Sequence, residues 1–565
     1  MKTSIPQQRP SVAELFLPKL LTVLREGYDA RALRADALAG LTVAIVALPL
    51  SMAIAIASGV GPERGLYTAI VGGFLVSALG GSRFQVGGPA GAFIVLVAAC
   101  VAQIGVGGLI LATILSGAML MVAGALRLGS YIRFIPYPVT VGFTAGIGVI
   151  IFASQLTGLF GLTLAGPEPG PLIDKLGAIW TARGSVTWAA VAVAAGTIAI
   201  IEALKRWRPR WPSLLIGVAA ATLATALLGL PVETIGSRFG ALPRLPPLPG
   251  LPAVDAALVA AALPWAAQFT LLGAIESLLS AVVADGMSGR HHRANAELVA
   301  QGVANIGAGL FGGFCVTGTI ARTATNVRAG ARGPVAGMLH SVFLLGFLLL
   351  AAPLASGIPL AALAGVLAIV AWGMIEREAM VALARASRGE AAVLAVTFLL
   401  VVLRDLTEGI VIGFAMGSLL FIGRMSRAVE VRAGHPLMPD DRPDTRGPIG
   451  DGLPDDAGVM VWHLRGAVFF GAAGTLASAL DRIAERPRAL VLDLSETPFV
   501  DTSGARMLAV LADRMVHQGC RVWISSATPE VRRMLLLAGM RPPAIRYKAR
   551  ITDAVAAARA APPAT

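Results

Sequence analysis

Long stretches of the chain carry no charged side chain at all. Asp, Glu, Lys and Arg are absent from six segments, which are residues 37–62, 84–126, 134–167, 211–232, 298–321 and 333–375. A helix that spans a lipid bilayer needs about 20 consecutive, mainly apolar residues. Each segment is therefore long enough to span a membrane, and the two segments of 43 residues can hold two spans each.

These runs, and the shorter apolar stretches between charged turns, predict fourteen membrane-spanning segments. They lie near residues 37–58, 66–81, 88–103, 107–126, 137–159, 186–204, 212–230, 264–284, 296–311, 319–330, 334–352, 358–375, 391–404 and 407–423. The third and the tenth are short for a full crossing. The pattern therefore indicates a polytopic α-helical membrane protein.

Composition and charge agree with this architecture. Only 14% of the 565 residues are charged, against about 25% in soluble domains. The net charge of +13 does not point to nucleic acid, because the basic residues lie in turns between the spans and are more numerous in alternate turns. By the positive-inside rule, this asymmetry places both termini in the cytoplasm. Residues 1–36 are polar and contain no apolar core of a signal peptide, so we expect a cytosolic N-terminal segment.

The composition changes after Arg427. Residues 428–458 are rich in Pro, Gly and Asp, which is typical of a linker. Beyond it, strands at 459–464, 489–494 and 520–526 alternate with helices at 502–519 and 529–539, which predicts a small α/β domain. The expected organisation is a cytosolic segment (1–36), a membrane domain (37–427), a linker (428–458) and an α/β domain (459–560).

An internal repeat relates the two halves of the membrane domain. The segment FQVGGPAGA begins at Phe84 and FCVTGTIAR begins at Phe314, and each follows a Gly-Gly pair. The segments upstream, 46–59 and 273–286, also correspond. The first seven spans therefore resemble the second seven, and an odd number of spans per half places the halves in opposite orientations, as in many secondary transporters.

The repeated motifs predict an anion site. Gly and Pro would break a helix in mid-membrane, where irregular backbone is tolerated only if it is buried in protein or lines a cavity. Two half-helices that begin there would direct free N–H groups and positive dipole ends at one anion. The alternative is that the glycines only allow close helix packing. The predicted substrate-binding residues are Gly88, Pro89, Ala90, Gly91, Ala92, Gly318, Thr319, Ile320, Ala321, Arg322 and Thr323.

Two charged residues lie within predicted spans near this site. Glu276 is the only charged residue in 256–284, and an intramembrane carboxylate is a functional candidate by default. We expect it to bind the driving proton, or less readily Na⁺; the alternative is a static ion pair with Arg322. Arg322 could bind a carboxylate or sulfate, or could serve only as a structural partner of Glu276 or of backbone carbonyls.

We expect the other polar residues of the membrane domain to have structural roles. Asp285, His291 and His292 are expected in a solvated turn without metal-ligand spacing, and His340 is expected to be a core histidine whose polar atoms are satisfied. Three cysteines suggest neither a disulfide framework nor a zinc site. No cofactor or metal is expected. An enzyme is not expected either, because no nucleophile–base set or phosphate-binding loop is present.

Two segments of the sequence resemble those of a known family. The run PERGLYTAIVGGFLVSALGGSRFQVGGPAGAF (62–93) resembles the signature of the SulP sulfate-permease family, and LDLSETPFVDTSGARML (492–508) resembles its C-terminal STAS domain. The resemblance covers nearly the whole chain. It implies a uracil-permease-like fold of fourteen spans in seven-plus-seven inverted repeats, in which a core domain moves against a gate domain. It also implies a homodimer in a bacterial inner membrane.

Segments 271–302 and 319–331 are most similar to the C4-dicarboxylate transporters of that family. This implies proton-coupled uptake of succinate and fumarate, with Glu276 at a position where Na⁺-coupled bicarbonate members have Asp. Leu50 stands where some relatives have an acidic residue, and Ala321 stands where animal members often have Ser before the basic residue. Sulfate or bicarbonate is the alternative substrate. A regulatory or scaffold protein with vestigial transport is an alternative of a different class.

The STAS-like segment contains a candidate regulatory site. Ser503, in Asp501-Thr502-Ser503-Gly504, matches the serine that is phosphorylated in related domains, which implies a cytosolic regulator as a partner. The alternative is that Ser503 only caps the following helix.

Overall fold

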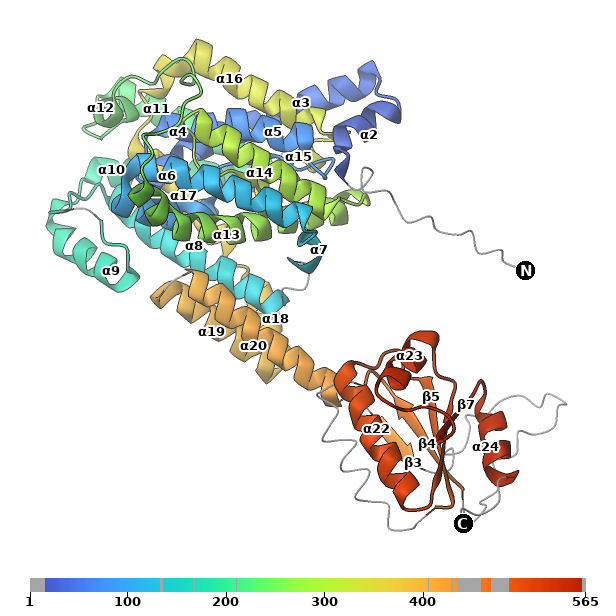
Figure 1. The fold of residues 1–565 in the computed structure, drawn as a ribbon. Helices are drawn as coiled ribbons and strands as arrows, with labels where there is room; N and C mark the ends of the chain where they lie inside the picture. The colour runs from blue at the N-terminus through green and yellow to red at the C-terminus, as the bar shows by residue number, and fades with distance from the viewer. Residues whose placement is uncertain are drawn as a thin grey trace. The chain divides into compact units, whose positions relative to one another are not determined.

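The computed structural model describes residues 16–132, 136–166, 168–209, 211–404, 406–427, 430–433, 459–468 and 487–560. The chain forms two compact units, Met1–Ala415 and Met416–Thr565. The first is almost entirely helical and the second is a mixed α/β unit (Figure 1).

The first unit is built from helices of very different length. In chain order these are α2 (Lys19–Arg25), α3 (Ala30–Ala57), α4 (Pro62–Tyr67), η1 (Thr68–Gly72), α5 (Gly73–Leu79), η2 (Gly91–Phe93), α6 (Ile94–Ala125), α7 (Gly129–Ile132), α8 (Tyr137–Phe160), α9 (Leu172–Thr181), η3 (Ala182–Ser185), α10 (Trp188–Trp207), α11 (Ser213–Leu228), α12 (Ile235–Phe239), α13 (Ala256–Ser288), α14 (Ala294–Leu310), α15 (Ile320–Arg328), α16 (Val335–Ala355), α17 (Leu360–Met374), α18 (Arg377–Ala386) and α19 (Arg388–Leu403). Helix α20 (Leu406–Arg427) crosses the boundary between the units.

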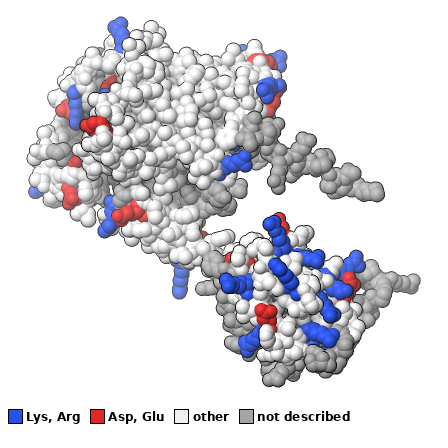
Figure 2. All heavy atoms as spheres, viewed as in Figure 1, with Lys and Arg blue, Asp and Glu red and all other residues white. Residues whose placement is uncertain are grey.

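Within the described residues, eight helices are long and apolar enough to cross a membrane. They are Ala30–Ala57, Gly91–Ala125, Tyr137–Phe160, Trp188–Trp207, Ala256–Ser288, Val335–Ala355, Leu360–Arg385 and Leu406–Met425. On the face shown in Figure 2, the surface of this unit is largely uncharged, whereas Lys and Arg are frequent on the second unit. The chain is therefore a polytopic α-helical membrane protein.

One predicted interruption is a kink. The third and fourth predicted segments, 88–103 and 107–126, both lie in the apolar stretch Gly91–Ala125, where Gly105 has a non-helical φ of 68° and ψ of −179°. Glycine adopts a positive φ readily. Two helices therefore meet at a kink here, and the predicted division between them is confirmed.

Glycines let the helices of the first unit approach closely. Helices α6 and α14 lie side by side (Figure 1), and a Cβ on Gly117 would lie 2.6 Å from the Gly302 carbonyl oxygen. A Cβ on Gly302 would in turn lie 2.5 Å from the Gly117 carbonyl oxygen. No larger residue fits at either position without moving a helix, as is usual where small residues form membrane helix contacts.

Two very short strands cross inside the helical unit. Strand β1 (Gly87–Gly88) and strand β2 (Thr317–Gly318) pair antiparallel, with Gly87 opposite Gly318 and Gly88 opposite Thr317. Each strand leads directly into a helix. The two repeated sequence motifs therefore meet in space.

The second unit contains a five-stranded sheet in the order β3-β4-β5-β6-β7. Strand β3 (Glu430–Ala433) is antiparallel to β4 (Val459–Arg465), and the remaining neighbours, β5 (Ala489–Glu496), β6 (Arg521–Ser525) and β7 (Ile545–Lys548), are parallel. One sheet face packs against helices α22 (Thr502–His517) and α23 (Pro529–Leu537), and the other against α24 (Ile551–Ala560).

The structure adds three elements to those predicted for the α/β domain. Strand β3 lies inside the segment predicted as a linker, because four residues are too short to stand out against its Pro-, Gly- and Asp-rich surroundings. Strand β7 and helix α24 were not predicted either. The other expected strands and helices of this domain are present.

Candidate anion site

The site lies where the paired strands become helices. Beyond β1 the chain passes through Ala90, the N-cap of η2, into α6; beyond β2, Thr319 is the N-cap of α15. Neither N-cap side chain accepts a hydrogen bond from its own helix. The first N–H groups of a helix lack partners within the helix, so both ends can bind a negative charge.

Backbone and hydroxyl contacts fix the crossing. The Thr319 amide donates to the Val86 carbonyl (3.1 Å), and the Val86 amide donates to Thr323 Oγ1 (3.2 Å). Thr323 Oγ1 also lies 3.0 Å from Ser280 Oγ of α13. Thr319 and Thr323 are both buried. The Thr319 amide and the Thr323 hydroxyl therefore hold the two segments together.

Arg322 is buried at the centre of the crossing and is only 1% exposed. Its Nη1 donates to the Gly87 carbonyl (3.3 Å), and its Nη2 donates to Ser51 Oγ (3.0 Å) and the Pro89 carbonyl (3.4 Å). Its Nε has no hydrogen-bond partner in the described part of the chain. A guanidinium has five donors, so Arg322 braces β1 and still has a donor left.

The remaining predicted residues of the site fall into two groups. Gly88, Pro89 and Ala90 are buried with Ala92 and Gly318, and Gly91 is partly buried, whereas Ile320 and Ala321 are exposed on α15. The helical spacing explains the difference, because Arg322, Thr323 and Asn326 form the buried face of α15.

Glu276 lies on α13 and is 8% exposed. Within the described residues its carboxylate makes neither a hydrogen bond nor an ion pair, and in particular it forms no ion pair with Arg322. The alternative of a static Glu276–Arg322 pair is therefore wrong for this structure. A buried carboxylate without a protein partner is costly unless another species binds it.

Sequence reasoning missed several residues that build the site. Gln85 Nε2 donates to the carbonyl and hydroxyl oxygens of Ser277 (3.1 and 3.0 Å). Ser51 accepts from Arg322, and Asn305 forms two bonds with the backbone of Val316 (2.9 and 3.1 Å). Glu297, Gln301 and Asn305 are spaced four residues apart and so form a polar stripe on one face of α14. This spacing was the sequence signal that could have identified them.

Three other predictions need correction or fall outside the described atoms. His292 and Asp285 are paired rather than solvated: His292 Nδ1 lies 2.7 Å from Asp285 Oδ2, and only the neighbouring His291 is fully exposed. His340 is fully buried, but neither ring nitrogen has a hydrogen-bond partner in the described residues, so it is not a satisfied core histidine.

Ser503 does not cap α22. The N-cap is Asp501, whose Oδ1 accepts from the Gly504 amide (2.6 Å). The backbone of Ser503 lies in the first turn of this helix, and its side chain is outside the described atoms. The alternative that Ser503 acts as the cap is therefore wrong.

Comparison with known proteins identifies this class of membrane protein. The sulfate permease family matches residues 33–397, and the STAS domain matches residues 453–554. The chain therefore belongs to the sulfate permease family and carries a C-terminal STAS domain. It is a secondary anion transporter, not an enzyme.

Two bacterial relatives are similar over almost their whole length. YvdB of Bacillus subtilis, provisionally named a sulfate transporter, is 36% identical over 520 residues, which cover 91% of this chain and 95% of YvdB. The bicarbonate transporter BicA of Synechocystis is 31% identical and is matched over 89% of this chain and 90% of BicA. Both relatives are named as transporters of inorganic anions, one of sulfate and one of bicarbonate. The expected similarity to C4-dicarboxylate transporters in particular is not supported by these names.

Two solved structures share the fold. SLC26A9 superimposes with a TM-score of 0.82 over 97% of this chain and 93% of its own, at 19% identity. The transmembrane domain of a cyanobacterial BicA superimposes with a TM-score of 0.61 over 67% of this chain and 98% of its own, at 31% identity. The fold is therefore that of the SLC26 transporters.

Proposed function

We propose that this protein transports a small inorganic oxyanion, sulfate or bicarbonate, by alternating access. The observation that carries the proposal is the antiparallel pair of β1 and β2, with Gly87 opposite Gly318. This pairing brings the N-terminal ends of two half-helices to one place, where their N–H groups and dipoles favour a negative charge. The names of the bacterial relatives support an inorganic anion as substrate.

The anion would bind between Gly88–Ala92 and Gly318–Thr323. Helix N-termini and a guanidinium supply many donors in a small volume, which suits a compact oxyanion. Arg322 contributes positive charge and its unpaired Nε, while its other nitrogens hold β1 in place. The exposed Ile320 and Ala321 would line the approach rather than contact the bound anion.

Fourteen spans in two inverted repeats of seven would surround this site. The paired Gly-Gly motifs before Phe84 and Phe314 support the repeat, and helices occur at the predicted positions in the described residues. In this uracil-permease-like arrangement, a core domain that carries β1, β2 and Glu276 would move against a gate domain. Both termini would face the cytoplasm of a bacterial cell, and two chains would form a homodimer in its inner membrane.

Glu276 would couple transport to a cation. Its buried carboxylate has no partner in the described part of the protein, and a proton would remove the cost of its charge. Proton symport is the mode we propose, with Na⁺ as the rival coupling ion. Protonation would then favour passage of the loaded core domain across the membrane.

The STAS domain would act on transport through a cytosolic regulator. Ser503, in the first turn of α22, is the proposed phosphosite. A phosphate near a helix N-terminus gains favourable interactions with the free N–H groups there. A pure scaffold role is disfavoured because the paired half-helix motifs and the buried Glu276 are intact.

The experiment that tests the substrate is competition in liposomes that contain the purified protein. We expect labelled sulfate to enter and an excess of unlabelled sulfate or bicarbonate, but not succinate, to inhibit its uptake. If succinate inhibits sulfate uptake and is itself accumulated faster, the C4-dicarboxylate expected from the sequence replaces the inorganic anion. If none of the three is transported, the proposal fails.

A further inference from the structure

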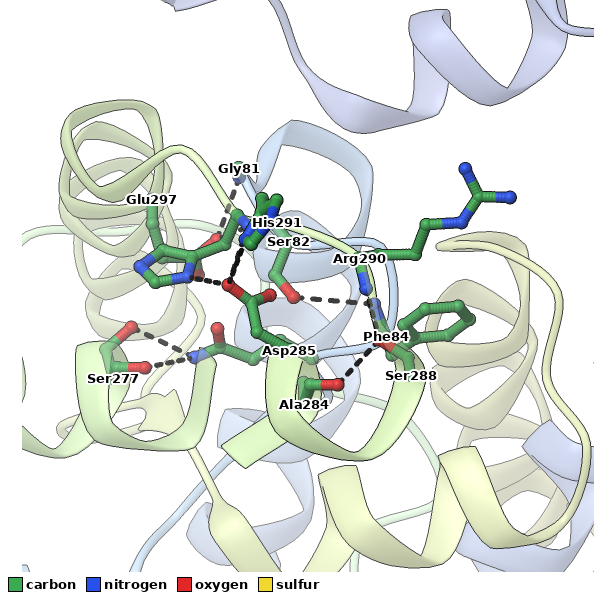
Figure 3. A network of polar contacts seen from close by, with 12 residues as sticks. Gly81, Ser82, Phe84, Ser277, Ala284, Asp285, Ser288, Arg290, His291 and Glu297 are labelled. Atoms are coloured by element: carbon green, nitrogen blue, oxygen red, sulfur yellow. Dashed lines mark hydrogen bonds and ion pairs between the residues drawn. The ribbon is translucent and has the colours of Figure 1, made fainter. Parts of the chain in front are cut away.

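A buried carboxylate on α14 holds the peptide that leads into β1. Glu297 is completely buried, and its Oε2 accepts from the backbone amides of Gly81 (2.8 Å) and Ser82 (3.0 Å), as Figure 3 shows. Its Oε1 accepts from Gln301 Nε2 (3.1 Å). The Arg293 amide also donates to the Gly81 carbonyl (3.0 Å). The peptide after α5 is therefore held on both its N–H and its carbonyl side by the start of α14.

A basic residue on α4 holds the peptide that leads into β2. Arg64 Nη1 donates to the Gly312 carbonyl (2.7 Å). One helical turn later, Thr68 Oγ1 accepts from the Phe314 amide (2.9 Å). This peptide is thus also held by a side chain from a helix of the opposite half of the chain.

The two sets of contacts are reciprocal. Gly81 and Gly313 end the equivalent Gly-Gly pairs before Phe84 and Phe314. In each half, the helical segment before the Gly-Gly pair contacts the pair of the other half; this segment comprises α4, η1 and α5 in the first half and α14 in the second. We propose that Glu297 and Arg64 are reciprocal positioning residues, each of which holds the peptide entering the other half-helix and so sets the geometry of the anion site.

This role follows from the needs of irregular backbone inside a membrane protein. Residues 80–86 and 312–316 lie outside any helix. The Gly312 and Gly313 amides still donate to α14 carbonyls, but other backbone groups here need partners from side chains or neighbouring segments, because buried backbone groups must be paired. Neither Glu297 nor Arg64 touches the half-helix ends. Each acts through the peptide that it holds, so each is a positioning residue rather than an anion ligand.

The chemistry of the bonds predicts which substitutions preserve the role. Glu297 uses only acceptor capacity, and Gln301 Oε1 has no partner in the described residues. In Glu297→Gln, the new amide oxygen can still accept from Gly81 and Ser82, and the new amide nitrogen can donate to a rotated Gln301 side chain. Arg64→Lys likewise retains a donor for the Gly312 carbonyl. Alanine at either position removes the contact.

The test combines hydrogen exchange on the full-length protein with anion uptake. We expect Glu297→Ala to speed exchange of amides in 80–86 by about tenfold while 312–317 changes little, and Arg64→Ala to do the reverse. Glu297→Gln and Arg64→Lys should exchange like the wild type. The matched control is Asn295→Ala, which removes a side-chain bond from α14 to the Gly129 amide (3.0 Å) and should leave both peptides unchanged.

The uptake measurement rests on the proposed function, whereas the exchange measurement does not. In liposomes, both alanine variants should raise the KM for the anion by about tenfold and lower the maximal rate less, and the conservative variants should restore the KM. If each alanine variant loosens both peptides equally, or if Glu297→Gln behaves like Glu297→Ala, the proposal is overturned. If the wild type transports none of the tested anions but the exchange pattern is reciprocal, the proposed function fails and the positioning role stands.

Discussion

Arg322 fills the space next to Gly88. A Cβ built on Gly88 would overlap guanidinium Nη1 of Arg322, although the two residues belong to opposite halves of the chain. The contact explains why a glycine stands at this point of β1, since any larger residue would displace the guanidinium from the Gly87 and Pro89 carbonyls. The half-helix ends and the Arg322 guanidinium are therefore packed together as one structural unit.

Replacing Gly88 by Ala should abolish high-affinity transport. The methyl group would force Arg322 away from β1, and we expect the KM for the anion to rise by at least about tenfold, because hydrogen bonds to a charged group contribute about 1.5–3 kcal/mol each. The matched control is Gly273→Ala on α13, where the new Cβ would lie 3.6 Å from Phe93 in ordinary contact. Equal KM values for the two variants in a liposome uptake assay would contradict this account.

Ser51→Ala should weaken transport moderately and Arg322→Lys severely. Ser51 accepts one bond from Arg322 Nη2 (3.0 Å), so its loss should raise the KM about fivefold, which corresponds to about 1 kcal/mol. A lysine ammonium cannot reach Ser51 and the Gly87 carbonyl together, because it lacks the planar fork of a guanidinium. A lysine variant with wild-type KM would show that Arg322 supplies only charge.

Asp36→Asn should destabilise the membrane domain. Asp36 is fully buried near the start of α3; its Oδ2 accepts from Tyr28 Oη (2.6 Å) and its Oδ1 from the backbone amides of Arg332 and Gly333. An amide nitrogen would face one of these donors, so we expect a loss of about 1–3 kcal/mol. Thermal unfolding in detergent measures this loss. Tyr28→Phe removes one bond only and should cost less; a larger loss for Tyr28→Phe would refute the assignment.

The stability of the second unit should depend on pH through the ionisation of Asp493. Its carboxylate accepts from Ser495 Oγ (2.6 Å) and Ser525 Oγ (2.9 Å), and His463 Nδ1 lies 3.1 Å away. Burial raises the pKa of Asp493, but hydrogen bonds from Ser495, Ser525, Ser526 and His463 outweigh it and hold the pKa below its ordinary value. Because the folded state binds this proton less tightly than the unfolded state, the stabilisation is complete above the ordinary pKa and is lost as the pH falls through the folded pKa.

Asp493→Asn should therefore lower the local opening free energy of β5 and β6 by about 1–2 kcal/mol at neutral pH. The difference from the wild type should begin to shrink as the pH falls below about 4, the ordinary pKa of aspartate, and should vanish below the lowered pKa of the folded state, where the wild-type carboxyl is also neutral. Hydrogen exchange of peptides from β5 and β6 in the full chain measures it. The exposed Glu496, changed to Gln, is the control and should have little effect. A difference that persists unchanged at low pH would contradict the role of the charge.

Much of the fold was accessible from the sequence because its signals are local. Charge-free runs locate membrane helices directly, and the strands β4, β5 and β6 stand out as short, mainly apolar runs. Strand β3 was missed. Its Pro-rich neighbourhood, a local composition signal, dominated over a strand pairing that depends on distant residues.

The meeting of the two repeated motifs could be expected from the sequence for a different reason. The repeated Phe-x-Val-x-Gly motif indicated that two segments share a role, and their pairing is what the structure contains. The contacts that fix Arg322 could not be predicted, because Ser51 and the Gly87 carbonyl approach it only after the halves pack together. The absence of a Glu276–Arg322 pair depends on the same packing.

The measurement that tests the central claim most directly is anion accumulation in liposomes under an imposed inward proton gradient. Wild type, Glu276→Gln and a control, the exposed Glu202→Gln, would be compared with labelled sulfate and bicarbonate. The account predicts that the gradient drives accumulation by the wild type and the control, whereas Glu276→Gln only exchanges anions or is inactive. Equal gradient-driven accumulation by Glu276→Gln and the wild type would contradict it.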